Sequence, residues 1–245
     1  MPSKVILKIA EGGFREKVFI AGFHGFGFVG YLTARHLVKV LKGVRIGYVI
    51  SPFMPQVVST CSEGIATPYE LYDTGSAVVF LPNAPLTRND VFRVPYALAE
   101  ASFTGGARMA ILVGGLDASF RGGEGVLRYA ATRSFLARYG YLVKGELPLE
   151  EGLSIVGPLA AMLAYYEANN FPSVAILPYT DPSTADPLAA KTAVDFIAKI
   201  LDVQVDSSEL LKLAEEKVRL EKELELLKSK AEQEGGKPKV PTFYV

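Results

Sequence analysis

The chain has 245 residues, of which 49% are hydrophobic, a size that suits one large domain or one domain with an appendage. Its 26 basic and 26 acidic residues balance, so no basic field favours nucleic acid or an anionic membrane surface as a partner. Cys61 is the only cysteine, which excludes an internal disulfide and a cysteine zinc cluster and fits a reducing cytoplasm.

Two stretches without charged residues, 18–34 and 46–62, raise the question of membrane spans. Four glycines interrupt the first stretch, and Pro52 and Pro55 interrupt the second. A spanning helix needs about 20 apolar residues, whereas strands buried on both faces give short apolar runs bounded by turn residues. The first residues, MPSKVILKIAEGG, carry charges within their apolar run and do not resemble a signal peptide. We therefore expect a cytoplasmic protein with buried strands here.

Strand-like and helix-like segments alternate along the body of the chain. Strands are predicted at 17–23 and 44–50, as a pair within 64–82 around the turn 73–76, and at 108–116 and 173–179. Helices are predicted at 27–43 with Gly43 as C-cap, from Asn89 or Asp90 to Phe103, at 124–138, at 154–170, and at 186–201 with Asp186 as cap and Pro187 in first position. The alternation predicts an α/β three-layer sandwich, a mostly parallel sheet with helices on both faces.

The composition changes near Val205, where a long polar helix is predicted over 206–233. Leu213, Leu220 and Leu227 recur every seven residues, and Leu210, Leu224 and Ala231 occupy the partner positions of the heptad, which Lys217 interrupts. Such a helix either docks on its own domain or pairs with copies of itself, and its seam favours a homo-oligomer. The chain then divides into a core domain (1–205), the heptad helix (206–233) and a flexible linker with a terminal tail (234–245).

A glycine motif follows the first predicted buried strand. Gly25, Gly27 and Gly30 have the G-x-G-x-x-G spacing between a strand and a helix, the context of a dinucleotide-binding turn. No Asp or Glu occurs between Glu16 and Glu63, so the acidic residue that would hold a ribose is absent. The motif is interpreted mainly as a packing turn, with an anion or nucleotide site as the alternative.

No catalytic or metal site stands out, and no cofactor is expected. His24 lies in the glycine turn and His36 on the helix after it, without a metal-binding spacing. Asp117, with Arg121 and Glu124, follows a strand end, where open α/β sheets bind ligands. A cluster of this kind is more typical of a solvated turn. Cys61 is interpreted as a small buried thiol, with a nucleophile as the alternative.

The last three residues are apolar although the segment before them is polar. Phe243, Tyr244 and Val245 follow EGGKPKVPT, so a flexible arm ends in a hydrophobic-Tyr-X triplet. A tyrosine ring supplies rigid apolar area with a hydroxyl, and a free terminal carboxylate is recognised by cations or backbone N–H groups. The triplet is therefore the predicted partner-binding site.

The blocks VFIAGFHGFGFVGYLTARHL, GLSIVGPLAAMLAYYE and ILPYTDPSTADPLAAKTAVDFIAKILDVQVDSSELLKLA resemble the archaeal proteasome assembly chaperone family. This resemblance covers most of residues 15–215. It implies a sandwich related to nucleoside phosphorylases, and protein binding rather than catalysis. It also implies that the terminal hydrophobic-Tyr-X motif (HbYX) enters pockets between α-subunits of the 20S proteasome or a related ring. Phe243 would then be the hydrophobic member, Tyr244 the anchor and Val245 the carboxylate donor.

Three functional hypotheses follow. The first is a non-enzymatic homo-oligomer that presents several tails to a proteasomal ring. The second is a nucleoside- or nucleotide-directed phosphorylase or hydrolase that uses the turn at Gly25–Gly30, with His24 and Asp117. The third is a structural oligomer whose tail packs on a neighbouring copy.

Overall fold

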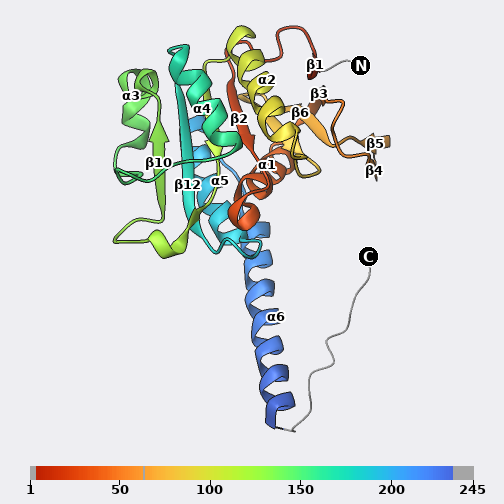
Figure 1. Ribbon diagram of the computed structural model, residues 1–245, viewed down its shortest axis with the longest axis vertical. Helices are drawn as coiled ribbons and strands as arrows, with labels where there is room; N and C mark the ends of the chain where they lie inside the picture. Colours follow the sequence, from red (N-terminus) through yellow and green to blue (C-terminus); the bar gives the residue numbers. More distant parts are fainter. Residues whose placement is uncertain (1–3, 63, 234–245) are drawn as a thin grey trace.

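Figure 1 shows a computed structural model of the protein, in which residues 4–62 and 64–233 are described. A sheet of ten strands runs through the body, in the order β1-β3-β6-β7-β2-β8-β12-β10-β11, with β9 paired to β12. These strands are β1 (Ile6–Ile9), β2 (Val18–Gly22), β3 (Val44–Ile50), β6 (Tyr69–Asp73), β7 (Ala77–Pro82), β8 (Met109–Val113), β9 (Leu116–Asp117), β10 (Leu127–Ala131), β11 (Leu147–Pro148) and β12 (Ser173–Thr180). A separate hairpin joins β4 (Ser59–Cys61) to β5 (Gly64–Ala66).

The centre of the sheet is parallel, whereas the outer strands on the β1 side and the ladder between β12 and β10 on the other side are antiparallel. β7, β2, β8 and β12 pair in parallel, as the strand-helix alternation predicts. The ladders β1-β3, β3-β6 and β6-β7 are antiparallel. The predicted α/β sandwich is confirmed, although the sequence did not distinguish the antiparallel side from the parallel centre.

Helices cover both faces of this sheet, as Figure 1 shows. The helices are α1 (Val29–Val40), α2 (Asp90–Thr104), α3 (Arg133–Tyr139), α4 (Pro158–Ala168), α5 (Pro187–Leu201) and α6 (Ser208–Gln233), with short 3-10 turns η1 (Phe26–Phe28), η2 (Ala118–Phe120) and η3 (Gly140–Val143). α1, α3 and α5 bury side chains in the core on one face, and α2 and α4 in the core on the other. No helix in the described ranges is long and apolar enough to cross a membrane.

Central strands supply both cores because their side chains alternate between the two faces. In β2, Val18 and Ile20 belong to the core under α1 and α5, whereas Phe19 and Ala21 belong to the core under α2 and α4. All five residues of β2 are buried. This explains why the strand reads as a continuous apolar run rather than as a membrane segment.

The ends of α5 and α1 lie close to where the sequence predicts them. Asp186 accepts a hydrogen bond from the backbone N–H of Ala189 at 3.0 Å, which confirms it as the cap of α5. At the end of α1, Lys42 rather than Gly43 takes the left-handed conformation, with φ of 51°. The N–H of Gly43 still donates to the carbonyl of Val38 at 2.8 Å, so this glycine closes the helix from one position further on.

The helix predicted over 124–138 is wrong in its first half. Residues Leu127–Ala131 form β10, which pairs antiparallel with β12, and the helix begins only at Arg133. Helix-forming alanine, leucine and arginine suggested a helix, but Leu127, Tyr129 and Ala131 all pack into one core with the period of a strand. The Thr132 hydroxyl accepts from the N–H of Phe135 at 3.3 Å and starts α3.

A buried carboxylate joins β3, β6 and the turn after β7. The side chain of Glu70 is fully buried. Its oxygens accept from Arg45 Nη1 at 3.0 Å, the N–H of Thr67 at 2.8 Å, the hydroxyl of Tyr72 at 2.7 Å and Asn83 Nδ2 at 3.1 Å. Burial alone would raise the pKa of Glu70, but the hydrogen bonds outweigh burial and lower this pKa below its ordinary value.

Candidate functional site

The glycine turn lies between β2 and α1, and two of its glycines are required by close packing. A Cβ on Gly30 would lie 2.5 Å from the carbonyl oxygen of Val113 and 2.6 Å from the nitrogen of Phe23. A Cβ on Gly27, which has φ of 59°, would lie 2.1 Å from the Thr180 hydroxyl. These contacts account for Gly27 and Gly30 without any ligand.

Gly25 differs from the other two glycines. Its φ of −134° is open to any residue, and a Cβ there would meet no heavy atom within 4 Å. The free side of Gly25 faces a cavity of about 400 Å³. The turn therefore combines two packing glycines with one that borders a pocket.

This cavity, here called the carboxyl-edge pocket, opens where β2, β8 and β12 end. The turn after β2, the loop after β8 and the segment 149–159 before and at the start of α4 form its walls. Ligands of open α/β sheets bind at this edge, where the connections of neighbouring strands diverge. Most of the lining is apolar, namely Phe23, Phe26, Val113, Leu116, Phe120, Leu149, Leu153, Ile155, Val156, Pro158, Leu159 and Leu177.

Few polar side chains reach the pocket. His24 stacks on Tyr31 with ring centroids 4.4 Å apart, and burial lowers the pKa of its imidazole, which favours the neutral ring. Asp117 accepts a hydrogen bond from the N–H of Ser119 at 2.8 Å, so it holds its own turn. Ser154 supplies the only hydroxyl among the lining residues in the described part of the chain.

The structure thus brings together His24, Asp117, Gly25 and Gly30, four residues that the sequence linked to an enzyme. Gly27, Arg121 and Glu124 do not line the pocket; Arg121 lies over the ring of Tyr179, with its guanidinium carbon 5.7 Å from the ring centroid. The segment 149–157 was missed as a pocket wall, because nothing in its local pattern places it beside the glycine turn.

Metal chemistry finds no support in the ranges that the structure describes. No group of three or more His, Cys, Asp or Glu side chains there is arranged to hold an ion. His36 Nε2 lies 2.9 Å from the carbonyl oxygen of Asp206, which places this histidine in a structural contact. Cys61 is exposed on β4, so the expectation of a buried thiol is wrong; all three residues of this short strand are exposed.

The first turn of α6 is anchored to its own domain. Leu210 is only 2% exposed and belongs to the core under α1 and α5. Lys39 Nζ donates to both carboxylate oxygens of Glu209, at 2.7 and 2.8 Å. Leu210 is therefore part of the domain core rather than of a contact between chains, which corrects its assignment to the oligomer seam.

Beyond its anchor, α6 projects away from the body (Figure 1). Of the predicted seam, Leu213 is 41% and Leu220 54% exposed. The side chains of Leu224 and Leu227 lie outside the described part of the structure, as do Phe243, Tyr244 and Val245. The role of the seam in oligomerisation and the role of the tail in partner binding therefore remain predictions.

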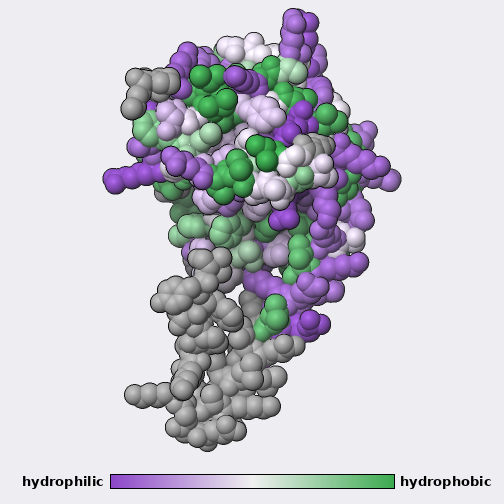
Figure 2. Space-filling view, turned by 90° about the vertical axis from the view of Figure 1, so that its right-hand side faces the viewer, coloured by the Kyte–Doolittle hydropathy of each residue, from purple (hydrophilic) through white to green (hydrophobic). Residues whose placement is uncertain are grey.

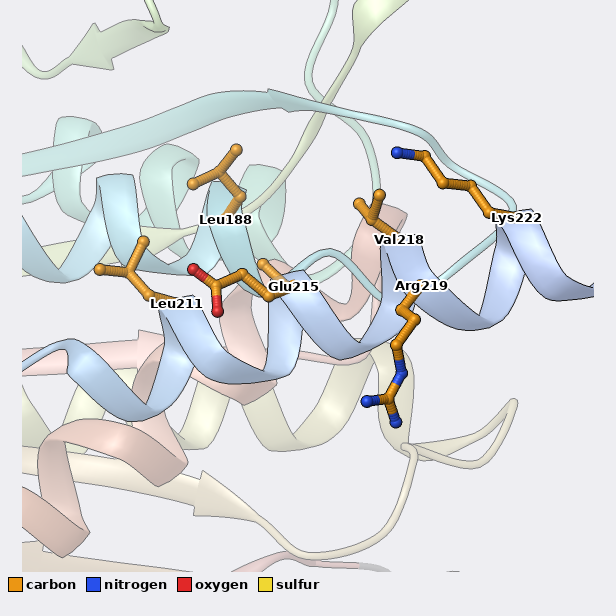
Figure 3. Close-up of a pocket in the computed structure, with 7 residues that line it drawn as sticks. Leu188, Leu211, Glu215, Val218, Arg219 and Lys222 are labelled. Atoms are coloured by element: carbon orange, nitrogen blue, oxygen red, sulfur yellow. The ribbon is translucent and has the colours of Figure 1, made fainter.

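A second apolar stripe runs along another side of α6. Leu211, Ala214 and Val218 recur at helical spacing and, with Leu188 of α5, line a shallow groove of about 460 Å³. In Figure 3, Leu188, Leu211 and Val218 project to the same side of α6, whereas Arg219 points away. At 100° per residue, this stripe lies nearly opposite the seam of Leu213 and Leu220.

An apolar surface also appears on the side of the molecule that bears the β4-β5 hairpin. Figure 2 views this side and shows hydrophobic side chains among polar ones. Val57, Val58 and Ile65 are exposed there. About half of the surface of each of these side chains is exposed.

A family model and a curated relative both match most of the chain. The model of the PAC2 family matches residues 19–225. An uncharacterized protein of Methanocaldococcus jannaschii is 27% identical over 203 residues, 80% of this chain and 78% of that protein.

Solved structures share the fold. Pyrococcus furiosus PbaA, described as an archaeal homolog of proteasome-assembly chaperone, is 24% identical with a TM-score of 0.78, over 94% of this chain and 97% of PbaA. Pyrococcus furiosus PbaB, described as an archaeal proteasome activator, is 22% identical with a TM-score of 0.76, over 91% of this chain and 99% of PbaB. From the family match over residues 19–225 and this shared fold, we conclude that the chain belongs to the PAC2 family.

Proposed function

We propose that this protein is a non-enzymatic binding protein of the proteasome assembly chaperone or activator type. Its partner would be the α-ring of a 20S proteasome or a related ring protein. The support is family membership, together with the descriptions of PbaA as an assembly chaperone homolog and PbaB as a proteasome activator. The C-terminal residues Phe243, Tyr244 and Val245 would enter pockets of the ring as a hydrophobic-Tyr-X tail.

One observation carries this proposal. α6 leaves the body as a helix of 26 residues, and the sequence continues for residues 234–245 to an apolar end. A long helix followed by a Gly- and Pro-containing segment would let the terminal triplet reach a partner at some distance from the domain that carries it. An arm of this kind suits delivery of a peptide to a distant pocket better than it suits catalysis.

Self-association would make weak tails effective. A single tripeptide binds weakly, whereas several tails on one scaffold gain effective concentration for each later contact. The two stripes of α6 favour more than two copies. A helix in a two-stranded coiled coil uses one stripe, but a helix in a closed bundle contacts two neighbours through different faces.

Removal of the tail tests the proposal. Deletion of Phe243–Val245, or Tyr244→Ala alone, should abolish co-purification of a 20S particle from native lysate, because the anchor is lost. Thr242→Ala is the matched control, since it changes the same arm outside the triplet. Co-purification that survives the deletion would show that the ring is bound elsewhere or not at all.

A nucleotide-directed enzyme is the second candidate, favoured by the meeting of His24, Asp117 and Gly25 in one pocket. Thermal-shift measurements with nucleosides, nucleotides and phosphate test it. A specific rise in melting temperature that Gly25→Phe removes would support the enzyme. We expect no such rise, because the pocket is mainly apolar and no hydrogen bond joins Ser154 to His24 in the described part of the chain.

A further inference from the structure

We propose that the groove between β1 and α2 is a docking site for an extended segment of a partner protein, which adds a strand to the free edge of β1. The segment would carry apolar side chains at alternate positions and an acidic residue beside Lys4. This groove shares no lining residue with the carboxyl-edge pocket or with the groove on α6. The site goes beyond the proposed function and is tested without a proteasome.

The edge of β1 carries backbone groups that the sheet leaves unpaired. In the part of the chain that the structure describes, β1 pairs with β3 alone and ends the sheet. The N–H of Ala10 donates to the carbonyl of Ile46 at 2.9 Å, and bonded pairs alternate with non-bonded pairs along an antiparallel ladder. In this register Leu7 and Ile9 belong to non-bonded pairs. Their N–H and C=O groups therefore point away from β3 and can receive a further strand.

β1 has few of the features that normally protect an edge strand. Residues Ile6–Ile9 contain no proline, and their pairing with β3 has no bulge. The charged residue among them, Lys8, lies on the opposite face of the sheet from Leu7 and Ile9, which pack against the core under α2 and α4. The side of this edge that faces α2 is therefore apolar, and an added strand would displace no charge there.

α2 forms the other wall of a groove along this edge. The groove has a volume of about 860 Å³ and lies between Lys4, Val5 and Leu7 on one side and seven residues of α2 on the other. Phe92 and Tyr96 of that wall are 71% and 54% exposed, although each carries a large ring. A strand in the groove would cover both rings, and aromatic side chains of this kind supply much of the affinity at protein interfaces.

β1 and α2 run side by side in the same direction. Ile6 lies at the start of β1, and Ser51 follows the residue that pairs with it. The hydroxyl of Ser51 donates to the carboxylate of Asp90 at the start of α2. Beyond the end of β1, the N–H of Glu16 donates at 2.9 Å to the carbonyl of Gly106, just after α2. The groove therefore has two different ends, one where both elements begin and one where both finish.

Charges along the groove would orient the bound segment. Lys4 and Arg93 line the end where both elements begin, and Glu100 follows about 10 Å further along α2, at about 1.5 Å per residue. The guanidinium carbon of Arg93 lies 4.5 Å from the ring centroid of Phe53, so Lys4 is the cation that we assign to the segment. An acidic side chain of the segment would lie beside Lys4, and a basic or polar one beside Glu100.

A single extended segment fits this groove better than a second copy of the chain does. Two copies paired through their β1 strands would each bring α2 to the same face of the joined sheet. The paired strands would lie about 4.8 Å apart, whereas packed helices need about 8–10 Å between their axes. Because α2 borders β1 along the groove, two α2 helices would meet in the space that one strand can fill.

Selection from a phage library of random dodecapeptides tests the site directly. We expect the wild-type protein to enrich peptides with apolar residues at alternate positions and an acidic residue near one end. Leu7→Pro should remove this enrichment, because the N–H of residue 7 faces the open edge and proline there breaks no bond to β3. Lys8→Thr, on the opposite face of the sheet, is the matched control that should enrich the same peptides. Urea unfolding checks that both variants are folded.

The selected peptide then reports how it pairs. N-methylation at each position in turn should weaken binding about tenfold at alternate positions only, because every second N–H of an added strand faces β1. Hydrogen exchange followed by NMR should be fast at Leu7 and Ile9 in the free protein and about tenfold slower with peptide, and slow at Lys8 in both. Tyr96→Ala should also weaken binding about tenfold, whereas Leu136→Ala, at an exposed leucine of α3, should not.

Three results would overturn the proposal. One is the absence of enriched peptides on the wild-type protein, or equal enrichment on folded Leu7→Pro. Another is N-methylation that acts at every position or at none, which would exclude strand addition even where Leu7→Pro does not fold. The third is displacement of the selected peptide by a peptide of residues 4–10, which would assign the edge to a second copy of the chain.

Discussion

Substitution of Gly30 by alanine separates a packing role of the glycine turn from a ligand-binding role. The new Cβ would lie 2.5 Å from the carbonyl oxygen of Val113, so α1 must move about 0.9 Å to reach an ordinary contact of 3.4 Å. A gap of that size forfeits a quarter to a half of the dispersion energy of the contacts it opens, and Val29, Ala34 and Leu37 make such contacts from α1.

Two effects of the substitution oppose each other. Alanine favours a helix over glycine by about 1 kcal/mol, whereas overpacking costs about 1–3 kcal/mol and the gap adds to that cost. We expect a net loss of about 2 kcal/mol in the free energy of unfolding. Urea unfolding followed by circular dichroism measures it, with Gly25→Ala as the control that should lose nothing. Equal stabilities for Gly30→Ala and the wild type would refute the packing argument.

Three further predictions address the core and α6. Glu70→Gln should lower the free energy of unfolding by about 2–4 kcal/mol at neutral pH. The pKa of Glu70 is lowered in the fold, so its stabilisation is present above the ordinary pKa of glutamate and is lost as pH falls through the lowered one. Urea unfolding should therefore show the two proteins converging in acid. Leu210→Ala should cost about 2–4 kcal/mol and speed hydrogen exchange in the first turns of α6, whereas Leu213→Ala should do neither. Val218→Glu should reduce the mass of the assembly in light scattering, with Glu216→Ala as control; an unchanged mass would exclude the stripe of Leu211, Ala214 and Val218 from the interface.

Segments whose local pattern agrees with their environment could be predicted from the sequence. β2 is a buried apolar run, and α5 has its Asp-Pro start, so local chemistry and tertiary packing point to the same element. β10 failed because Ala130 and Ala131 favour a helix in isolation, while pairing with β12 imposes a strand. The outer strand β1 was missed for a related reason, since its place depends on pairing with β3.

The candidate site was also predictable only in part, because contacts between residues far apart in the sequence shape it. The G-x-G-x-x-G spacing marked the glycine turn, but the spacing does not say which glycine meets backbone and which meets a cavity. That distinction comes from Val113 and Thr180, which lie far away in the sequence. The heptad spacing of the leucines predicted a seam along α6. Leu210, however, is buried against residues of α1 and α5, and the spacing within α6 carries no information about those contacts.

Carboxylates near the carboxyl edge of this sheet are engaged within the fold itself. Enzymes of similar architecture keep polar groups at that edge free for a substrate. Here Asp117 holds Ser119, Asp181 accepts from the N–H and the hydroxyl of Ser183, and Asp186 accepts from Thr180 and Ala189. With those carboxylates engaged in turns and caps, the surface left at the pocket is mainly apolar. Such a surface offers an occupant apolar contact rather than a set of free carboxylates.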